Sequence, residues 1–221
     1  MFLKRLVRRT IRKLGIRIYR MEAEIANATL PEFANNPQRL RIARPRRIIN
    51  PEYMFLGDNI NIGPGSLLMA VKEYPGSFAK HPEKELVNQK FTPRISIGNR
   101  VTATANLQIA AHSDIVIEDD VLFASNINIT DALHGYKHAN EAYKYQPLFS
   151  IAPILIGKGC WIGQNVVVLP GVTIGIRSIV GANSVVTKSI PAQCIAVGAP
   201  ARVTKKWDNE SKQWVSVASD R

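Results

Sequence analysis

A six-residue rhythm of hydrophobic positions organises this chain and is most regular across residues 156–186. Six consecutive blocks open on an aliphatic residue, at Ile156, Ile162, Val168, Ile174, Val180 and Val186. A glycine often follows, and a small or aliphatic side chain usually stands four positions after the opening residue. A period of six does not match an α-helix, but it fits a short strand and a tight turn in repetition. The pattern predicts an all-β fold, a parallel β-helix in which three short sides close each coil around one aliphatic core.

The same rhythm covers most of the chain and is broken twice. It begins weakly near residue 48 and is interrupted at 74–94, a stretch with three prolines and many charges, and again at 135–153. Long segments that leave a compact repeat are commonly functional, so we expect both to be excursion loops. The β-helix domain is therefore expected to cover 48–202, followed by a C-terminal tail at 203–221.

The first 21 residues predict a basic amphipathic helix. Its apolar stripe has spacings of three and four and consists of Leu3, Val7, Ile11, Leu14 and Ile18. Residues 22–47 form a transition, in which three prolines break any long helix and five arginines make a second basic cluster. The basic helix of residues 1–20 predicts contact with an anionic membrane surface. The alternative is a helix that packs on its own trimer with a solvated basic rim.

The net charge of +12 belongs largely to this terminus. Eight of the 29 Lys and Arg residues lie in 1–20, which leaves 21 against 17 acidic residues for the rest. So small an excess is not typical of a nucleic-acid-binding protein, and we expect no nucleic acid partner. Two cysteines without metal-ligand spacing suit a reducing compartment, and no apolar run is long enough to span a bilayer. We expect a cytoplasmic protein, placed by its helix on the inner face of the membrane, and no metal.

Four segments in the second half of the chain resemble a known enzyme family. They are ITDALHGY at 129–136, PILIGKGCWIGQNVVVLPGVTIG at 153–175, IVGANSVVTKSIP at 179–191 and VGAPARV at 197–203. They resemble the hexapeptide-repeat acyltransferases, in particular the branch of galactoside, maltose, polysaccharide and xenobiotic O-acetyltransferases. The resemblance implies a left-handed β-helix, an exception to the usual right-handed crossover. It also implies a homotrimer with active sites between neighbouring subunits, and acetyl-CoA as the acyl donor.

His134 is the candidate catalytic base. It ends the block that opens at Ile129 and stands before a glycine and a long loop, so we expect a rigid coil to hold it beside a cleft. An alcohol is a poor nucleophile until its proton leaves, and an imidazole can take that proton near neutral pH. In the family that the chain resembles, the equivalent histidine does this in direct transfer from acetyl-CoA. Asp131 either orients His134 or caps the local turn, and both interpretations stay open.

The resemblance also indicates acceptor-binding positions. His112 stands where related sugar acetyltransferases place an acidic acceptor-binding residue, and Thr104 stands where they often place an asparagine. Both departures predict an acceptor other than a simple galactoside or maltose, although His112 can equally be a turn histidine. Tyr136 lies in the loop after His134 and could stack on a sugar ring or pack against its own coil.

The donor contacts of the family carry over to seven positions. Those along the pantetheine arm are Trp161, Gln164, Ala182, Thr187 and Lys188, and those near the nucleotide phosphates are Arg202 and Lys205. Positive charge at the last two has a physical reason, because the nucleotide of coenzyme A carries several negative charges.

Together these features predict an acetyl-CoA-dependent O-acetyltransferase that acts on a saccharide, either a surface polysaccharide or its lipid-linked precursor. A sugar-amine N-acetyltransferase or a xenobiotic O-acetyltransferase would use the same base, and both stay open as alternatives. A γ-type carbonic anhydrase would share the architecture, but the histidine spacing that its zinc requires is absent.

Overall fold

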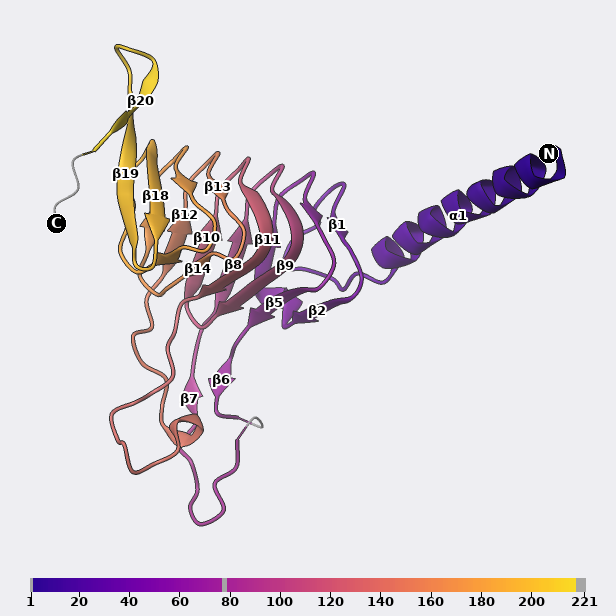
Figure 1. Ribbon diagram of the computed structural model, residues 1–221. Helices are drawn as coiled ribbons and strands as arrows, with labels where there is room; N and C mark the ends of the chain where they lie inside the picture. The colour runs from indigo at the N-terminus through magenta and orange to yellow at the C-terminus, as the bar shows by residue number, and fades with distance from the viewer. Residues whose placement is uncertain (1, 77–78, 218–221) are drawn as a thin grey trace.

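The computed structural model describes residues 2–76 and 79–217, with side chains from residue 8 onward. A long helix, α1 (Phe2–Ala28), projects from one end of an elongated solenoid (Figure 1). The chain climbs this solenoid coil by coil and leaves it at the other end in a two-stranded hairpin, so the two termini lie far apart (Figure 1).

Parallel strands stacked in register build the three faces of the solenoid. The first face consists of β1 (Arg41–Ile42), β4 (Asn61–Ile62), the first part of β9 (Thr102–Ala111), the first part of β11 (Leu122–Thr130), β13 (Trp161–Ile162), β16 (Ile179–Val180) and β18 (Cys194–Gly198). The second face consists of β2 (Arg46–Ile49), β5 (Ser66–Ala70), the remainders of β9 and β11, β14 (Val167–Val168) and β17 (Val185–Val186). The third face consists of β3 (Met54–Leu56), β8 (Arg94–Ile97), β10 (Asp114–Ile117), β12 (Ile154–Ile156) and β15 (Thr173–Ile174).

This architecture is a left-handed parallel β-helix; the rhythm predicted the β-helix, and the resemblance implied its hand. All six opening residues of the 156–186 stretch have an exposed fraction of 0%. Ile162 pairs in register with Phe123 in the coil before it and with Val180 in the coil after it. The aliphatic side chains therefore form one continuous column, and each buried side chain contributes about 1.5–3 kcal/mol.

Asparagines form a ladder at the corner between the first and second faces. Asn106, Asn126, Asn165 and Asn183 all adopt left-handed backbone conformations, with φ between 53° and 62°. Each side-chain amide donates to the next asparagine's oxygen, at 2.8, 2.9 and 2.8 Å along the ladder. Asparagine suits this position because it tolerates a positive φ better than most residues.

Both excursions leave the solenoid at the same corner, where the chain passes from the second face to the third, and we call it the loop corner. The first excursion runs from β5 to β8 and is closed by an antiparallel pair, β6 (Glu73–Tyr74) and β7 (Gln89–Lys90). The second runs from β11 to β12 and carries a short 3-10 helix, η2 (Tyr143–Tyr145).

The two excursions contact each other. The side-chain amide of Gln89 accepts from the backbone N–H of Leu148 at 2.6 Å and donates to its carbonyl at 3.0 Å. Farther out, the Lys84 ammonium pairs with the Glu141 carboxylate. The coil that contains β9 and β10 lies between the two coils from which the excursions leave. The paired excursions therefore lie over the loop corner of this middle coil, at residues 112–113.

The ends of the solenoid differ from the expected boundaries. Helix α1 continues beyond residue 21 because the alanine- and glutamate-rich sequence that follows favours a helix and no proline occurs before Pro31. Strand β1 and the first half of β2 lie inside the expected transition, and a short 3-10 helix, η1 (Pro51–Tyr53), follows them. In the expected tail, β19 (Ala201–Asp208) returns antiparallel to β18 and pairs with β20 (Gln213–Ser216). Among the described helices, none has both the length and the apolar character needed to cross a membrane.

Candidate active site at the loop corner

Tyr74, from the first excursion, holds His134 at the loop corner. The Tyr74 hydroxyl lies 3.2 Å from Nδ1 of His134 and donates to the backbone carbonyl of Lys144 at 2.8 Å. The two rings meet edge to face, with centroids 5.5 Å apart. Tyr74 is buried whereas His134 is exposed at the edge of a cleft. One side of the imidazole is therefore fixed, and the other faces solvent.

These contacts determine the tautomer of neutral His134. A carbonyl oxygen only accepts, so the single hydroxyl proton of Tyr74 is committed to Lys144. The hydroxyl oxygen must then accept from Nδ1–H of His134, which leaves the lone pair on Nε2. Burial raises the pKa of Tyr74, so its hydroxyl keeps its proton at neutral pH. Within the described chain no hydrogen bond engages Nε2 of His134, and this nitrogen can accept a proton from a ligand.

Asp131 pairs with His112 rather than with His134. Its carboxylate is fully buried, and Oδ1 accepts from the backbone N–H of His112 at 2.7 Å and from its Nδ1 at 2.9 Å. The other oxygen accepts from the backbone N–H of Ser113 at 2.6 Å. The carboxylate thus fixes the ring of His112 and also closes the turn after β9. The contacts correspond to neither role expected for Asp131: its carboxylate orients His112 instead of His134, and it caps the turn of the neighbouring coil instead of its own.

A cleft of about 550 Å³ connects the two histidines. Its walls are the outward side chains of the second face and the start of the second excursion, and both His112 and His134 line it. The side chains that line it are Leu67, Met69, Val71, Tyr74, Gln108, Ile109, Ala110, His112, Asn128, Ile129, Thr130, Ala132, Leu133, His134 and Leu148. At the α1 end the lining is Leu67, Met69 and Val71, whereas Gln108, Asn128 and Thr130 come from the coils that carry the histidines.

A second hollow, of about 560 Å³, adjoins this cleft toward α1. The two share Met69 and Val71 as lining residues, so they are adjacent, and we call them together the groove. Lys72 and Lys90 line the second hollow together with the carboxylate of Glu73. The groove therefore leads from the histidines, over an aliphatic floor, to a region with two ammonium groups.

Two of the residues expected at the acceptor site lie apart from the cleft lining. Thr104 is exposed near the asparagine ladder, and its hydroxyl contacts the carbonyl of Phe123 at 3.5 Å. Tyr136 is 67% exposed and packs edge to face on Phe149, with ring centroids 4.7 Å apart. Within one chain, the structure brings only His112 of the three expected acceptor residues into the cleft.

The expected donor residues fall into two groups on opposite sides of the solenoid. Trp161, 49% exposed, stands on the first face, and Arg202 and Lys205 lie on β19 at the edge of that face. Gln164 and Ala182 flank the asparagine ladder in successive coils.

Thr187 and Lys188 form the second donor group. They follow β17 at the loop corner, two coils beyond Thr130 and about 10 Å farther along the axis. They lie on the side of His134, across the solenoid from Trp161. A single subunit therefore does not bring all seven donor positions into one groove.

Neither cysteine is poised as a nucleophile. Both Cys160 and Cys194 are buried, and burial raises the pKa of the Cys160 thiol to about 11. A thiol in that state is protonated near neutral pH and is therefore a weak nucleophile. Among the described residues, no cluster of three or more His, Cys, Asp and Glu side chains is arranged to hold a metal ion.

Comparison with known proteins identifies the family. The profile of the bacterial transferase hexapeptide family, which spans six repeats, matches residues 153–188. A Schizosaccharomyces pombe protein provisionally named an acetyltransferase is 32% identical over 164 residues, which cover 70% of this chain and 76% of that protein. The chain belongs to the hexapeptide-repeat acyltransferase family.

Two relatives from Escherichia coli (strain K12) are also similar. The galactoside O-acetyltransferase is 40% identical over 120 residues, covering 54% of this chain and 58% of that protein. WbbJ, provisionally named a lipopolysaccharide biosynthesis O-acetyl transferase, is 39% identical over 127 residues, covering 54% of this chain and 64% of WbbJ. The chain thus spans less than two thirds of the length of either relative.

Among solved structures, a mutant of the N-acyltransferase AntD from Bacillus cereus, in complex with dTDP and coenzyme A, has the same fold. The TM-score is 0.63 at 18% identity, with 85% of this chain and 90% of that chain covered. At this identity the likeness concerns the fold alone.

Proposed function

We propose that this protein is an acetyl-CoA-dependent O-acetyltransferase that modifies a saccharide, either a surface polysaccharide or its lipid-linked precursor. The observation that carries the proposal is the fixed tautomer of His134, whose Nε2 lone pair is presented at the rim of the cleft. Membership of the hexapeptide-repeat acyltransferases supplies the reaction class, and this nitrogen supplies the base that transfer to a hydroxyl requires.

The transfer proceeds directly between the two substrates. Nε2 of His134 takes the proton of the acceptor hydroxyl while the oxygen attacks the thioester carbonyl. The tetrahedral intermediate then collapses, the C–S bond breaks, and the coenzyme A thiolate receives the proton from Nε2. During these steps Nδ1–H stays hydrogen-bonded to Tyr74, which keeps the ring oriented as its charge changes.

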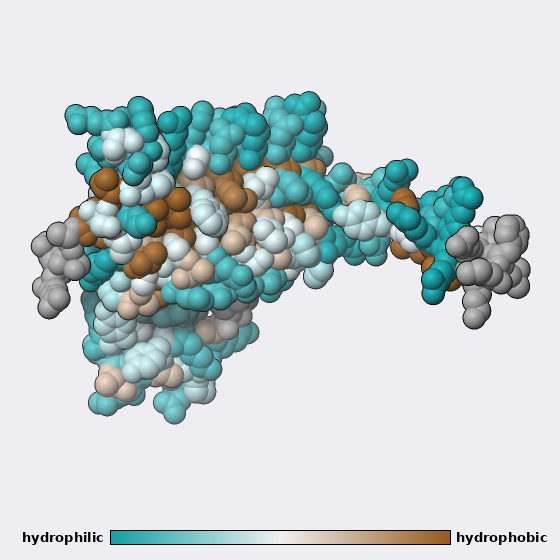
Figure 2. Space-filling view, turned by 45° about the horizontal axis from the view of Figure 1, so that its top comes forward, coloured by the Kyte–Doolittle hydropathy of each residue, from teal (hydrophilic) through white to brown (hydrophobic). Residues whose placement is uncertain are grey.

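The separated donor residues support a binding site between two subunits of a homotrimer. A coenzyme A molecule that contacts Lys188 of one subunit can reach Trp161 and Arg202 only on a neighbouring copy, because these residues lie across the solenoid. A band of hydrophobic side chains along the solenoid offers a surface for such an association (Figure 2). In this arrangement Arg202 and Lys205 neutralise the nucleotide phosphates, and Thr187 and Lys188 lie beside the pantetheine arm.

The acceptor binds in the groove that leads from His134 toward α1. Asp131 fixes His112 so that Nε2 of His112 can hold an acceptor hydroxyl, and Gln108 and Asn128 add neutral polar contacts. The ammonium groups of Lys72 and Lys90 favour an acceptor that continues into an anionic group, as a lipid-linked saccharide does. The provisional name of WbbJ, which concerns lipopolysaccharide biosynthesis, points to the same substrate class.

Helix α1 supports a position on the inner face of the membrane. From residue 8 to residue 20 its side chains are exposed on every side, including Ile11 at 64%, Leu14 at 57% and Ile18 at 50%. A helix with exposed apolar side chains and many Lys and Arg residues binds anionic bilayer surfaces without crossing them. Such a position places the groove near a lipid-linked acceptor.

The substrate is tested by mass spectrometry of the surface polysaccharide from host strains that carry the wild-type, His134→Ala or His138→Ala allele. His138 is an exposed loop histidine outside the cleft lining and serves as the control. We expect the acetyl groups to disappear only with His134→Ala. An unchanged acetyl pattern would contradict this substrate, and acetylation of an amino sugar instead of a hydroxyl would establish the N-acetyltransferase alternative.

A further inference from the structure

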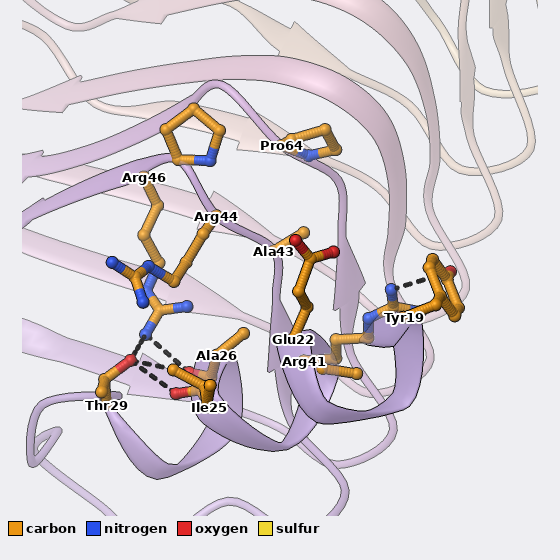
Figure 3. A pocket seen from close by; sticks show the side chains of 12 residues that line it. Tyr19, Glu22, Ile25, Ala26, Thr29, Arg41, Ala43, Arg44, Arg46 and Pro64 are labelled. Carbon is orange, nitrogen blue, oxygen red and sulfur yellow. Dashed lines mark hydrogen bonds between the residues drawn. The ribbon is translucent and has the colours of Figure 1, made fainter. Parts of the chain in front are cut away.

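A basic pocket of about 920 Å³ lies where α1 meets the first coil, and we call it the neck pocket. One wall is the last turns of α1, and the other is the turn between β1 and β2 (Figure 3). The residues that line it are Tyr19, Glu22, Ala23, Ile25, Ala26, Thr29, Arg41, Ala43, Arg44, Pro45, Arg46 and Pro64. It lies outside the groove that contains His112 and His134.

Arg46 holds the neck pocket together. Its guanidinium donates to the carbonyl of Ala26 at 2.7 Å and to the hydroxyl of Thr29 at 3.1 Å (Figure 3). It also donates to the carbonyl of Ile42. These contacts satisfy a free carbonyl at the C-terminal end of α1, where a positive charge is also favourable. Arg46 therefore fixes the helix to the solenoid, and its donors are already engaged.

Arg41 and Arg44 retain most of their donors for a ligand. Arg41 makes one long hydrogen bond, to the Tyr19 hydroxyl at 3.4 Å. The side chain of Arg44 forms no hydrogen bond or ion pair with any described residue, and Glu22, the one carboxylate in the lining, forms no ion pair within the same residues. Burial and, to a smaller extent, repulsion from the nearby charge of Arg44 lower the pKa of Arg46.

A phosphate group would relieve this repulsion. Guanidinium groups bind phosphate oxygens through paired, charge-assisted hydrogen bonds. The Tyr19 hydroxyl, which accepts from Arg41, lies on the same wall and keeps its proton for a further hydrogen bond to the phosphate. The pocket is large enough for a lipid headgroup. Three arginines against one glutamate leave a net positive lining.

The position of the pocket indicates the source of the phosphate. Ile25 lines the pocket and, at 43% exposed, also ends the apolar stripe that runs up α1 through Ile18, Leu14 and Ile11. A lipid whose headgroup enters the pocket can therefore lay its acyl chains along this stripe, which a soluble phosphate ester cannot use. We propose that the neck pocket binds the phosphate group of an anionic membrane lipid between Arg41 and Arg44.

The test is the binding of the full-length protein to vesicles of phosphatidylcholine with and without phosphatidylglycerol. The Arg41→Ala/Arg44→Ala variant removes two pocket charges, and Arg177→Ala/Lys212→Ala removes two exposed charges far from the pocket. We expect the pocket variant to bind phosphatidylglycerol vesicles at least about tenfold more weakly, since each basic residue near the surface contributes roughly 1 kcal/mol. The control variant should stay within about twofold of wild type.

If the two variants bound phosphatidylglycerol vesicles equally weakly, the proposal would be overturned, because net charge alone would then explain the attraction. Calorimetry with glycerol phosphate distinguishes a lipid headgroup from a soluble phosphate ester as the source of the phosphate group. The proposal would also be overturned if wild type bound this soluble ester tightly, Arg41→Ala/Arg44→Ala lost that binding, and the variant still bound vesicles as wild type does. Acetyl transfer to a water-soluble acceptor should be unchanged in the pocket variant, so the lipid site and the proposed activity succeed or fail separately.

Discussion

The coils across residues 156–190 and the loop corner of the earlier coils come from the same repeat but differ in function. In the later coils every opening residue is buried, each turn follows the last in register, and the core is aliphatic. At the loop corner the repeat is interrupted, and Tyr74, His112, Asp131 and His134 come together from three coils. The regular coils form the continuous core, and the proposed base and its partners lie where the repeat is broken. Substitutions should therefore affect stability in one region and turnover in the other.

The largest effect on turnover should come from His134→Ala. Removing the base should lower kcat about 100- to 10,000-fold, because general base catalysis contributes on that order. Thermal unfolding should be nearly unchanged, because the side chain is exposed and makes one hydrogen bond. Steady-state assays with acetyl-CoA and a saccharide acceptor measure this, with His138→Ala as the matched control. Turnover of His134→Ala within a few fold of wild type would remove the base from the mechanism.

The largest effect on stability should come from the regular coils. Ile162→Ala removes a side chain that is 0% exposed and should reduce the free energy of unfolding by about 2–5 kcal/mol. Ile176→Ala, at a position 50% exposed, is the control and should reduce the free energy of unfolding far less. Denaturant titration compares the two, and the folded fraction of each variant should keep wild-type kcat. Equal losses at the two positions would contradict the continuous core.

Tyr74→Phe should have an intermediate effect that is confined to the site. It removes the hydroxyl that accepts from Nδ1–H of His134 while it keeps the ring contact. We expect kcat to fall roughly 3- to 10-fold, the equivalent of one hydrogen bond of about 0.5–1.5 kcal/mol, and the pH dependence of kcat to shift. The KM for acetyl-CoA should be unchanged. A loss of stability with an unaltered pH profile would assign Tyr74 a structural role only.

The smallest effect concerns Asp119, at the corner between the third and first faces. The backbone N–H of Asn99 donates to its carboxylate at 2.7 Å and, with Arg100 nearby, holds the pKa of Asp119 below its usual value. A carboxyl group whose pKa is lowered on folding stabilises the folded state at pH values above its unfolded-state pKa. This stabilisation is lost as the pH falls through the folded-state pKa. Thermal melts from neutral to acid pH should give Asp119→Asn a lower melting temperature than wild type at pH 7, and the difference should vanish in acid. A difference that stays constant with pH would refute the assignment.

The parts of the fold set by local pattern were predictable from the sequence. The spacing of Ile156, Ile162 and Val168 identified the repeat, because one aliphatic residue per short side is needed to fill the interior of each coil. The continuation of α1 to Ala28 and the hairpin after Ala201 were missed, since neither follows the six-residue period. The first depends on local helix propensity, and the second on pairing with the last coil.

The site was predictable only in part. His134 was proposed from its motif, but its partner Tyr74 lies 60 residues earlier in an excursion without any repeat to align it. The pairing of Asp131 with His112 instead of His134 follows from the stacking of coils, in which Thr130 pairs with Ala110. A separation of 19 residues, close to one coil, was the available signal, whereas proximity in the sequence favoured His134.

The central claim is that His134 presents an unprotonated Nε2 to the acceptor because Tyr74 holds the proton on Nδ1. Nitrogen-15 NMR of the histidine rings at a pH where His134 is neutral tests this most directly, with His134→Ala used to assign the signals. The geometry predicts a proton on Nδ1 and a lone pair on Nε2 in the wild type, and a mixture of tautomers in Tyr74→Phe. A wild-type spectrum with the proton on Nε2 would contradict the proposed mechanism.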